Sequence, residues 1–571
     1  MKSINFTLIF IFIFSFELSQ NNTAYASNYP NYTPATPITI QQVALNKNNI
    51  NSWIINTGIF DHDLRTSNTP GFEWPIYTGQ DAIFSCGLSI AAMYSGSLRM
   101  AAAFYTGEFA PGYVVDSSGI TVARTDSRFK IYSVVPTDPN SNDWLHWGDM
   151  VPYGAPYTDV NHNQTYEPGI DIPGMPNAAQ TIFVCLTDGF SSQHTAGEGF
   201  GGGTAPLYAE VHLVAWTYNT TMQDVQFLKW DIYNKSHVAW NSTYFSIVCD
   251  PDLGCSDDDF IGCDTTGYFA DTARNLGFVY NSQEVDCAGS YRYTAIVPSA
   301  GIVLLEGAIN HNVNPPVQLK MTSFDYFTNP SAGGPSCETD PNPGANYAYN
   351  FMKGLKKDQT PWMFPPGGNA SYVTKFCYPG DPETGLGWCE KQGSPSGSVQ
   401  NCGGPNVYTG NFITSNTGGD RRFLMNSGAD NLTVNPGEKQ TISVAQMIAL
   451  GANRRNSVTH LKILCDHVKH FYLIGVIPIS DKVPEKYLLY QNYPNPFNPS
   501  TIIKYQIVRK GLVNLTVYDA IGRQVETLVS LSQNPGTYEV QWNAAAYPSG
   551  VYFYKLSTDG YSETKKLVLL K

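Results

Sequence analysis

The sequence predicts a mainly β protein made of several antiparallel β-sandwiches. Aromatic residues make up 13% of the 571-residue chain and charged residues only 14%, a combination typical of strand-rich proteins. The 50 Gly and 37 Pro residues supply turns between short strands. Many segments between these turns alternate apolar and polar residues with period two, as strands with one buried face do. The length predicts about three to five domains.

Charge is distributed unevenly along the chain. The net charge is −13, although the stretch from Glu485 onward holds nine basic and only six acidic residues. The preceding body is therefore more acidic than the chain as a whole. An acidic body argues against nucleic acid or anionic lipid as a partner and favours divalent cations.

Residues 1–26 are predicted to be a signal peptide. Lys2 precedes an apolar run from Phe6 to Phe16, and Ala24-Tyr25-Ala26 forms an A-x-A cleavage motif. Residues 27–49, rich in Asn, Pro and Thr, are expected to form an extended N-terminal arm. No later stretch is long and apolar enough to cross a membrane, so we expect an extracytoplasmic protein.

Residues 50–320 are predicted to form a β-rich body with acidic, calcium-type loops. The expected strands cover residues 82–94, 98–105, 207–218, 225–233 and 243–248. The first two strands are predicted to form a hairpin around Ser95-Gly96-Ser97. In the fourth strand Leu228, Trp230 and Ile232 share one face, which a second sheet would cover.

Residues 321–479 are predicted to form a second β-rich region with one short helix. The helix is expected over Asn456–Val468, where apolar residues recur at helical spacing. These residues are Val458, Leu461, Leu464 and Val468. Residues 480–486 are expected to be a short polar linker.

Residues 487–571 are predicted to form a small Ig-like sandwich. Alternating β-branched and aromatic residues lie between Gly, Pro and Asn turns. The expected strands include residues 502–507, 513–519, 536–542 and 551–556.

This tail resembles the type A C-terminal sorting domain of proteins exported by the type IX secretion system of certain Gram-negative bacteria. The matching segments are Asn492–Pro496, Val517–Asp519 with Gly522-Arg523, Pro548–Tyr552 and Lys565–Leu567. The resemblance implies the type IX secretion machinery as a partner and export across the outer membrane. It also implies removal of the tail, with release or anchoring at the cell surface.

The body is similar, in scattered segments, to large and mostly uncharacterised surface proteins that carry the same tail. The similar segments are Phe84–Leu88, Trp230–Asn234 with Asp250–Gly254, and Gly380–Pro382 with Gly385–Trp388. This resemblance implies no activity.

Eleven cysteines in an exported chain predict disulfide bonds. Two groups are close in sequence: Cys249, Cys255 and Cys263, and Cys377, Cys389 and Cys402. We therefore expect at least one bridge within one of these groups. The alternative is that several of these cysteines are buried thiols.

The loop from Asp159 to Asp171 is the first candidate calcium site. Hard oxygen ligands at alternate loop positions can surround Ca²⁺. The candidate ligands are Asp159, Asn161, Asn163, Thr165, Glu167 and Asp171. The loop resembles those of EF-hand-like and dockerin-type modules, except that Gln164 replaces the usual Gly and the closing acid falls at position 13. The alternative is an ordinary loop of Asx turns.

The stretch from Asp250 to Asp264 is the second candidate calcium site. Its candidate ligands are Asp250, Asp252, Asp257, Asp259 and Asp264. Carboxylates this close in sequence repel one another unless a cation or solvent separates them. The alternative is a solvated acidic loop.

The sequence predicts a non-catalytic protein with an adhesion, matrix or surface-layer role, stabilised by calcium. It contains no G-x-S-x-G, no H-E-x-x-H and no phosphate-binding loop. Surface polysaccharide or other surface proteins are the expected ligands. The alternatives are a secreted hydrolase with unrecognised catalytic residues and a carbohydrate-binding protein.

Truncation of the chain after Lys482 is predicted to leave a folded body in the periplasm, because the export signal is a separate domain. Fractionation of cells that express the full-length or the truncated chain measures this. Surface delivery of the truncated chain would contradict the prediction.

Overall fold

The computed structural model describes residues 39–65, 69–114, 127–161, 163–195, 199–219, 222–266, 273–329, 335–342, 344–364, 372–392, 402, 417–474, 477–480, 484, 486–509, 511–533, 535–544, 547–558 and 560–570. The predicted signal peptide and residues 27–38 of the predicted arm lie outside these ranges.

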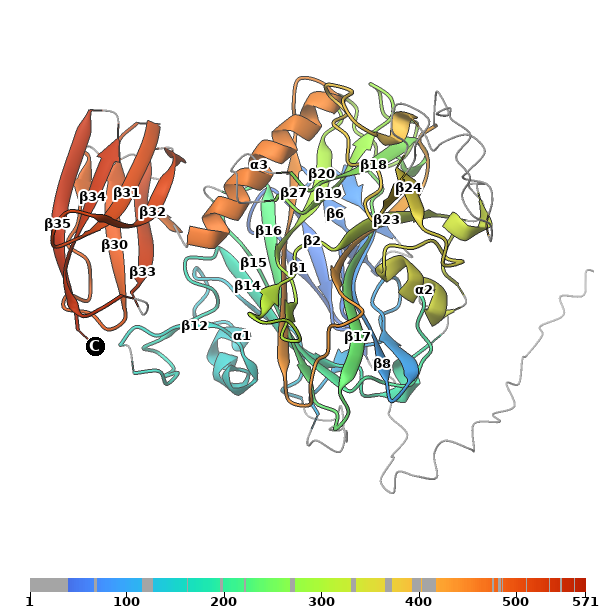
Figure 1. Cartoon of the computed structure of the whole chain (residues 1–571), viewed down its shortest axis with the longest axis horizontal. Coiled ribbons are helices and arrows are strands. Elements are labelled where there is room, and N and C mark those ends of the chain that lie inside the picture. The colour runs from blue at the N-terminus through green and yellow to red at the C-terminus, as the bar shows by residue number, and fades with distance from the viewer. Residues whose placement is uncertain are drawn as a thin grey trace, which may run out of the picture. The chain divides into compact units, whose positions relative to one another are not determined.

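Two large antiparallel sheets form the body (Figure 1). The first sheet has the order β1 (Gln42–Leu45), β2 (Ser52–Ile55), β3 (Ile59–Phe60), β8 (Ser85–Tyr94), β17 (Trp240–Asp250), β26 (Arg421–Gly428) and β23 (Ser323–Thr328), with β9 (Ser97–Ala101) paired to β8. The second has the order β10 (Ala110–Pro111), β14 (Gln180–Thr187), β15 (Ala209–Thr217), β16 (Val225–Asn234), β27 (Lys439–Ala449), β20 (Ser299–Glu306), β19 (Leu276–Asn281) and β18 (Asp259–Asp264), with β11 (Tyr132–Val134) paired to β14.

Short hairpins and two short helices lie outside the large sheets. The hairpins are β4 (His62–Asp63) with β5 (Thr69–Pro70), β6 (Phe72–Glu73) with β7 (Asp81–Ile83), β12 (Tyr157–Thr158) with β13 (Ile172–Pro173), β21 (Ile309–Asn310) with β22 (Val317–Gln318), and β24 (Trp362–Phe364) with β25 (Tyr372–Thr374). The helices are α1 (Asn142–Leu145) and α2 (Ala345–Met352).

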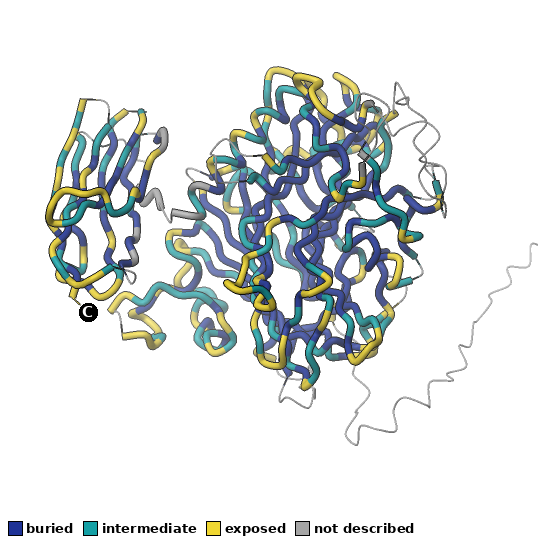
Figure 2. Tube along the Cα trace, in the orientation of Figure 1, coloured by how far each residue is buried: buried dark blue, intermediate teal, exposed yellow. Residues whose placement is uncertain are grey.

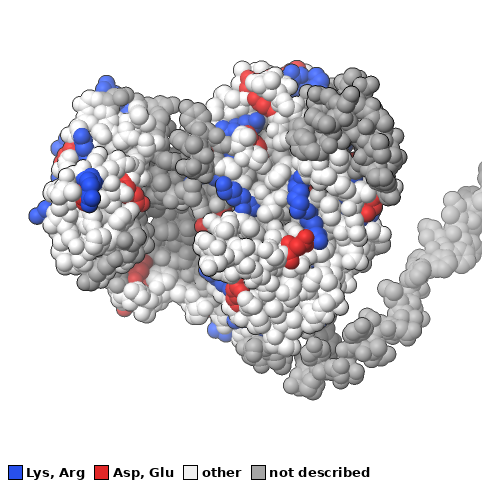
Figure 3. Space-filling view, viewed as in Figure 1, with Lys and Arg blue, Asp and Glu red and all other residues white. Residues whose placement is uncertain are grey.

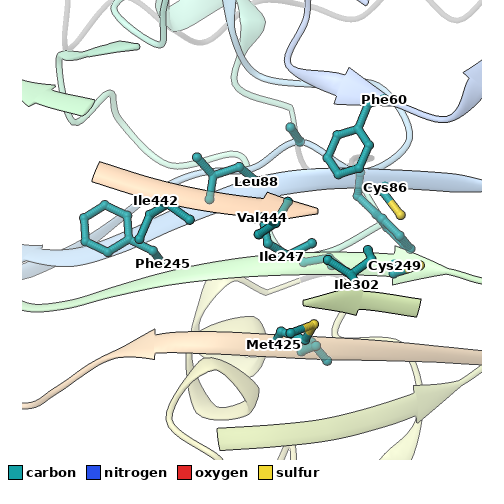
Figure 4. Close-up of a cluster of buried hydrophobic side chains, with 14 of the residues drawn as sticks. Phe60, Cys86, Leu88, Phe245, Ile247, Cys249, Ile302, Met425, Ile442 and Val444 are labelled. Atoms are coloured by element: carbon teal, nitrogen blue, oxygen red, sulfur yellow. The ribbon is translucent and has the colours of Figure 1, made fainter. Parts of the chain in front are cut away.

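The main core fills the space between the two sheets (Figures 2 and 4). Leu228, Trp230 and Ile232 of β16 are all buried in it, which confirms the apolar face predicted for this strand. The rings of Trp230 and Phe60 meet across the sheets, with centroids 5.8 Å apart. The hairpin predicted around Ser95 is also confirmed, since β8 and β9 pair up to Tyr94 and Ser97.

A second core lies on the outer face of the second sheet, under α3 (Arg454–Ile474). Val458, Leu461 and Val468 are fully buried there. Asn453 directly precedes the helix, and its Oδ1 accepts the backbone N–H of Asn456, as an N-cap residue does. It extends beyond the predicted range at both ends.

The predicted boundary between residues 320 and 321 divides a single sandwich. β26 lies between β17 and β23 in the first sheet, and β27 lies between β16 and β20 in the second. Residues assigned to the second region therefore supply interior strands to both sheets. Such long-range pairing leaves no local signal in the sequence, which explains the error.

Asn234 makes the turn that carries the chain from one sheet to the other. Its Oδ1 accepts hydrogen bonds from the backbone N–H and the hydroxyl of Ser236. Its Nδ2 donates to the carbonyls of Val238 and Val434. This buried side chain thereby fixes the crossover from β16 to β17.

The tail is a sandwich of two four-stranded antiparallel sheets. One has the order β28 (Ile477–Ser480), β33 (Gly536–Asn543), β30 (Ser500–Ile507) and β29 (Leu488–Leu489), and the other has the order β32 (Gln524–Gln533), β31 (Gly511–Asp519), β34 (Gly550–Thr558) and β35 (Tyr561–Leu569). Trp542, Tyr505 and Tyr554 are buried in its core. The edge strand β28 comes from before the predicted start at residue 487, because the backbone of Ile477 pairs with that of Glu539.

The disulfides differ from the predicted ones. Cys255 pairs with Cys287, and Cys337 with Cys402. Cys249 is a buried free thiol, and it lies within β17 directly opposite Cys86 of β8. Each bridge therefore joins one cysteine of a predicted group to a partner outside that group.

No helix in the described ranges is long and apolar enough to cross a membrane. Charged side chains are sparse on the face of the molecule shown in Figure 3, in keeping with the low charged content of the sequence.

Replacing Trp230 with Ala is expected to lower the free energy of unfolding of the body by about 3–5 kcal/mol, because it leaves a cavity between the sheets. Lys229→Ala is the matched control, since its side chain is 34% exposed and points away from this core. It should change the free energy by no more than about 0.5 kcal/mol. Equal midpoints of the two variants in denaturant unfolding would contradict this assignment of the core.

Candidate cation site

Three aspartates meet at one end of the first sheet of the body. Asp250 is the last residue of β17, Asp252 follows two residues later, and Asp420 directly precedes β26. β17 and β26 are paired neighbours, which brings residues distant in sequence to the same place. One carboxylate oxygen from each aspartate lies within 4.8 Å of the others.

A tyrosine and an arginine complete the cluster. The Tyr105 hydroxyl donates to Asp250 Oδ2 over 2.6 Å, and Arg422 Nε donates to the Tyr105 oxygen over 3.1 Å. The Arg422 guanidinium also lies 3.2 Å from Asp250 Oδ1 and 2.7 Å from Asp420 Oδ1. One arginine thus faces three carboxylates, which leaves an excess of negative charge.

Burial and mutual repulsion raise the pKa values of two of these acids, Asp250 and Asp252. Burial raises the pKa of Asp250 to about 7, against the opposing effect of Arg422. Burial, together with the charges of Asp250 and Asp420, raises the pKa of Asp252 well above its usual value. The pKa of the Tyr105 hydroxyl is also raised by burial and by Asp250, so this group stays protonated. The charged form of the cluster is therefore costly without a further cation.

The donor atoms suit a hard divalent cation. Carboxylate oxygens are the ligands that Ca²⁺ and Mg²⁺ prefer in proteins. Asp250, Asp252 and Asp420 could supply them, and Arg422 would balance part of the remaining charge.

The other predicted ligands of this stretch lie elsewhere. Asp257 is exposed, and the buried Asp259 accepts a hydrogen bond from the Leu253 backbone N–H. Asp264 forms ion pairs with Arg274, at 2.8 Å, and with Lys462, at 3.4 Å. Of the five predicted ligands, the cluster contains only Asp250 and Asp252.

Sequence reasoning missed Asp420, Tyr105 and Arg422. Each comes from a segment far from Asp250 in the chain, and only the pairing of β26 with β17 reveals that Asp420 is close. A local motif search has no means of finding such residues.

The loop from Asp159 to Asp171 is closed by its own side chains. Asn161 and Asn163 donate from Nδ2 to Glu167 Oε2, over 2.5 and 2.7 Å. Asp171 accepts the backbone N–H groups of Val160 and Glu167. These bonds bring both predicted asparagine ligands to one predicted acidic ligand.

The remaining predicted ligands of this loop accept or donate backbone hydrogen bonds within it. Asp159 accepts the backbone N–H groups of Asn163 and Gln164, and Thr165 donates its own to Asn163 Oδ1. Gln164 has φ +62°, so the chain makes the left-handed bend that favours Gly without having a Gly there. The loop is thus compatible with either a calcium loop or a series of Asx turns.

Comparison with known proteins identifies the tail. Residues 491–570 match the family described as "Secretion system C-terminal sorting domain". No curated protein matches the chain.

The similar solved structures include a polysaccharide lyase, at 10% identity, with 81% of this chain and 47% of the lyase covered and a TM-score of 0.17. They also include Escherichia coli alpha-2-macroglobulin, at 7% identity, with 94% of this chain and 44% of that protein covered and a TM-score of 0.11. The chain spans less than half the length of either structure.

The tail match agrees with the motifs in the sequence and with the separate sandwich that the tail forms. This chain therefore carries a type IX C-terminal sorting domain and is exported to the cell surface or secreted.

Proposed function

We propose that this protein is a non-catalytic sandwich protein of the cell surface or secreted fraction, with an adhesion, matrix or surface-layer role, and that calcium stabilises it. The observation that carries the proposal is the cluster of Asp250, Asp252 and Asp420 beside a single arginine. A cation there would stabilise the body outside the cell, where divalent metal ions are available.

Of the three aspartates, Asp252 is the one whose negative charge is least compensated by its neighbours. Its carboxylate accepts no hydrogen bond from any residue that the structure describes, and it faces the charges of Asp250 and Asp420. Repulsion of this kind destabilises the folded state when no cation is bound. A bound Ca²⁺ would replace that repulsion with attraction. The loop from Asp159 to Asp171 would be a second, more exposed calcium site.

A secreted hydrolase is the second candidate function. The observation that favours it is the pKa of Asp250, which at about 7 suits a general acid at neutral pH. Neighbouring Asp252 and Asp420 would then be the partner carboxylates. In this case Asp250→Asn would abolish a polymer-degrading activity of the secreted protein, whereas the non-catalytic proposal expects no such activity to be lost.

Calcium is expected to raise the thermal midpoint of the mature protein. The free energy of unfolding should rise by about 2.7 kcal/mol when the free calcium concentration is 100 times the dissociation constant. Asp252→Asn should have two opposite effects. In chelator the variant should be more stable than the parent, because it lacks one of the repelling charges, and in calcium it should gain less. Asp159→Ala tests the loop from Asp159 to Asp171 in the same way, and it should reduce the stabilisation that calcium gives through this loop.

Asp257→Asn is the matched control, since it removes an exposed acid from the same segment that lies outside the cluster. Asp257 has the smallest effect among the charges that shift the pKa of Asp252, so the response of this variant to calcium and chelator should be close to that of the parent. A calcium shift that is the same in the parent, Asp252→Asn and Asp159→Ala would contradict both proposed sites.

Stability in chelator is expected to fall as the pH rises from 3.8 to about 7. A carboxylate with a raised folded-state pKa binds its proton more tightly in the folded protein, and this stabilisation is lost as the proton leaves. Asp250→Asn removes this titration, so its stability should fall less over the same range. Denaturant midpoints measured across this pH range test the difference, and parallel curves for the two proteins would contradict it.

A further inference from the structure

A cysteine, a histidine and a glutamate meet on the outer face of the second sheet of the body. Cys185 of β14 lies directly opposite His212 of β15 in the antiparallel register. Glu210 precedes His212 by two residues on the same strand, so its side chain points to the same face. One ligand atom from each of the three residues lies within 4.8 Å of the others.

All three side chains are withdrawn from solvent. Cys185, Glu210 and His212 are 1%, 5% and 7% exposed. The His212 ring packs against the Tyr233 ring, with centroids 4.9 Å apart. On another side Gly154 has φ +89°, and a Cβ added there would lie 2.9 Å from His212 Nδ1. The backbone of residue 154 therefore closes over the imidazole.

Among the described residues, the hydrogen bonds leave one nitrogen of the histidine without a partner. His212 Nε2 lies 3.0 Å from Glu210 Oε1, and Glu210 Oε2 accepts the Val114 backbone N–H over 2.9 Å. His212 Nδ1 is buried and has no hydrogen-bond partner among the described residues. A buried polar atom left in this way is costly unless a ligand satisfies it.

We propose that Cys185, His212 and Glu210 bind a zinc ion. Thiolate, imidazole and carboxylate are the three ligand types that zinc accepts in proteins, whereas calcium takes oxygen ligands alone. Three protein ligands leave one position of a tetrahedral zinc ion for a water molecule or another donor. This site is therefore chemically distinct from the oxygen-only cluster around Asp250.

Binding requires a proton to leave the thiol. Burial and the charge of Glu210 raise the pKa of Cys185 well above its usual value, and the thiol donates to the Gly112 carbonyl over 3.2 Å. When zinc binds, the Zn–S bond forms, the S–H bond breaks, and the proton is released to solvent. No electron is transferred in this step.

The surroundings of Cys185 do not suit a nucleophilic cysteine. A catalytic thiol needs a lowered pKa and access to a substrate, and Cys185 has neither. Burial alone would raise the pKa of Glu210, but hydrogen bonds from His212 and the Val114 N–H, with the charges of His212 and Lys235, lower it overall. The carboxylate form of Glu210 is therefore favoured beside the thiol and the imidazole.

The test measures metal binding by the full-length mature protein after chelator treatment. The parent should bind one zinc ion more than C185S or H212Q does, and cobalt(II) should give a thiolate charge-transfer band in the parent alone. E210Q should weaken zinc binding by at least about 10–100-fold. C465S is the matched control, because Cys465 is a buried thiol in the core under α3 on the same face of the sheet, and it should bind as the parent does.

Two results would overturn the proposal. One is equal zinc content in the parent, C185S and H212Q, each confirmed as folded by circular dichroism. The other is the absence of a cobalt–thiolate band in the parent, a result that holds even if C185S fails to fold. Neither measurement depends on calcium, so this proposal and the calcium proposal can fail independently.

Discussion

The apolar layer between the two sheets is the interaction on which the body depends. Trp230 of β16 faces Phe60 of β3 across this layer, and strands from almost the whole length of the body contribute to it. β16 also buries the first part of its opposite face, where Val225 and Phe227 lie in the core under α3. A strand that is covered on both sides holds three layers together, which explains why its sequence is so rich in aromatic and aliphatic residues.

Polar groups collect where this layer ends. β17 and β26 pair side by side through the core. Asp250, at the end of β17, therefore lies at the same edge as Asp420 and Arg422, at the start of β26. The zinc proposal concerns a different surface, the outer face of β14 and β15, where the register sets Cys185 against His212. In both places the sheet aligns functional groups through strand pairing, and no loop motif is needed.

Sequence patterns predicted the parts of this structure that depend on nearby residues. The hairpin at Ser95, the apolar face of β16 and the core of α3 all follow from local periodicity, and the tail was identified from its motifs. The pairing of β27 with both β16 and β20 could not be predicted, because it depends on contacts between segments more than a hundred residues apart. Asp420 was missed for the same reason. The disulfide partners are only 32 and 65 residues apart, but they too lie in separate segments that the fold brings together.

The edge strand β28 would remain bound to the tail after a cut in the segment that joins tail and body. β28 begins at Ile477, close to the end of α3 at Ile474, and pairs with β33 of the tail. A protease that cuts between Ser480 and Tyr487 breaks the covalent link but leaves these strands hydrogen-bonded. Release of the body then requires the strands to separate, and this exposes the edge of β33 on the detached tail. The cut tail is thus a sandwich with an open edge, able to accept another strand in place of the one it has lost.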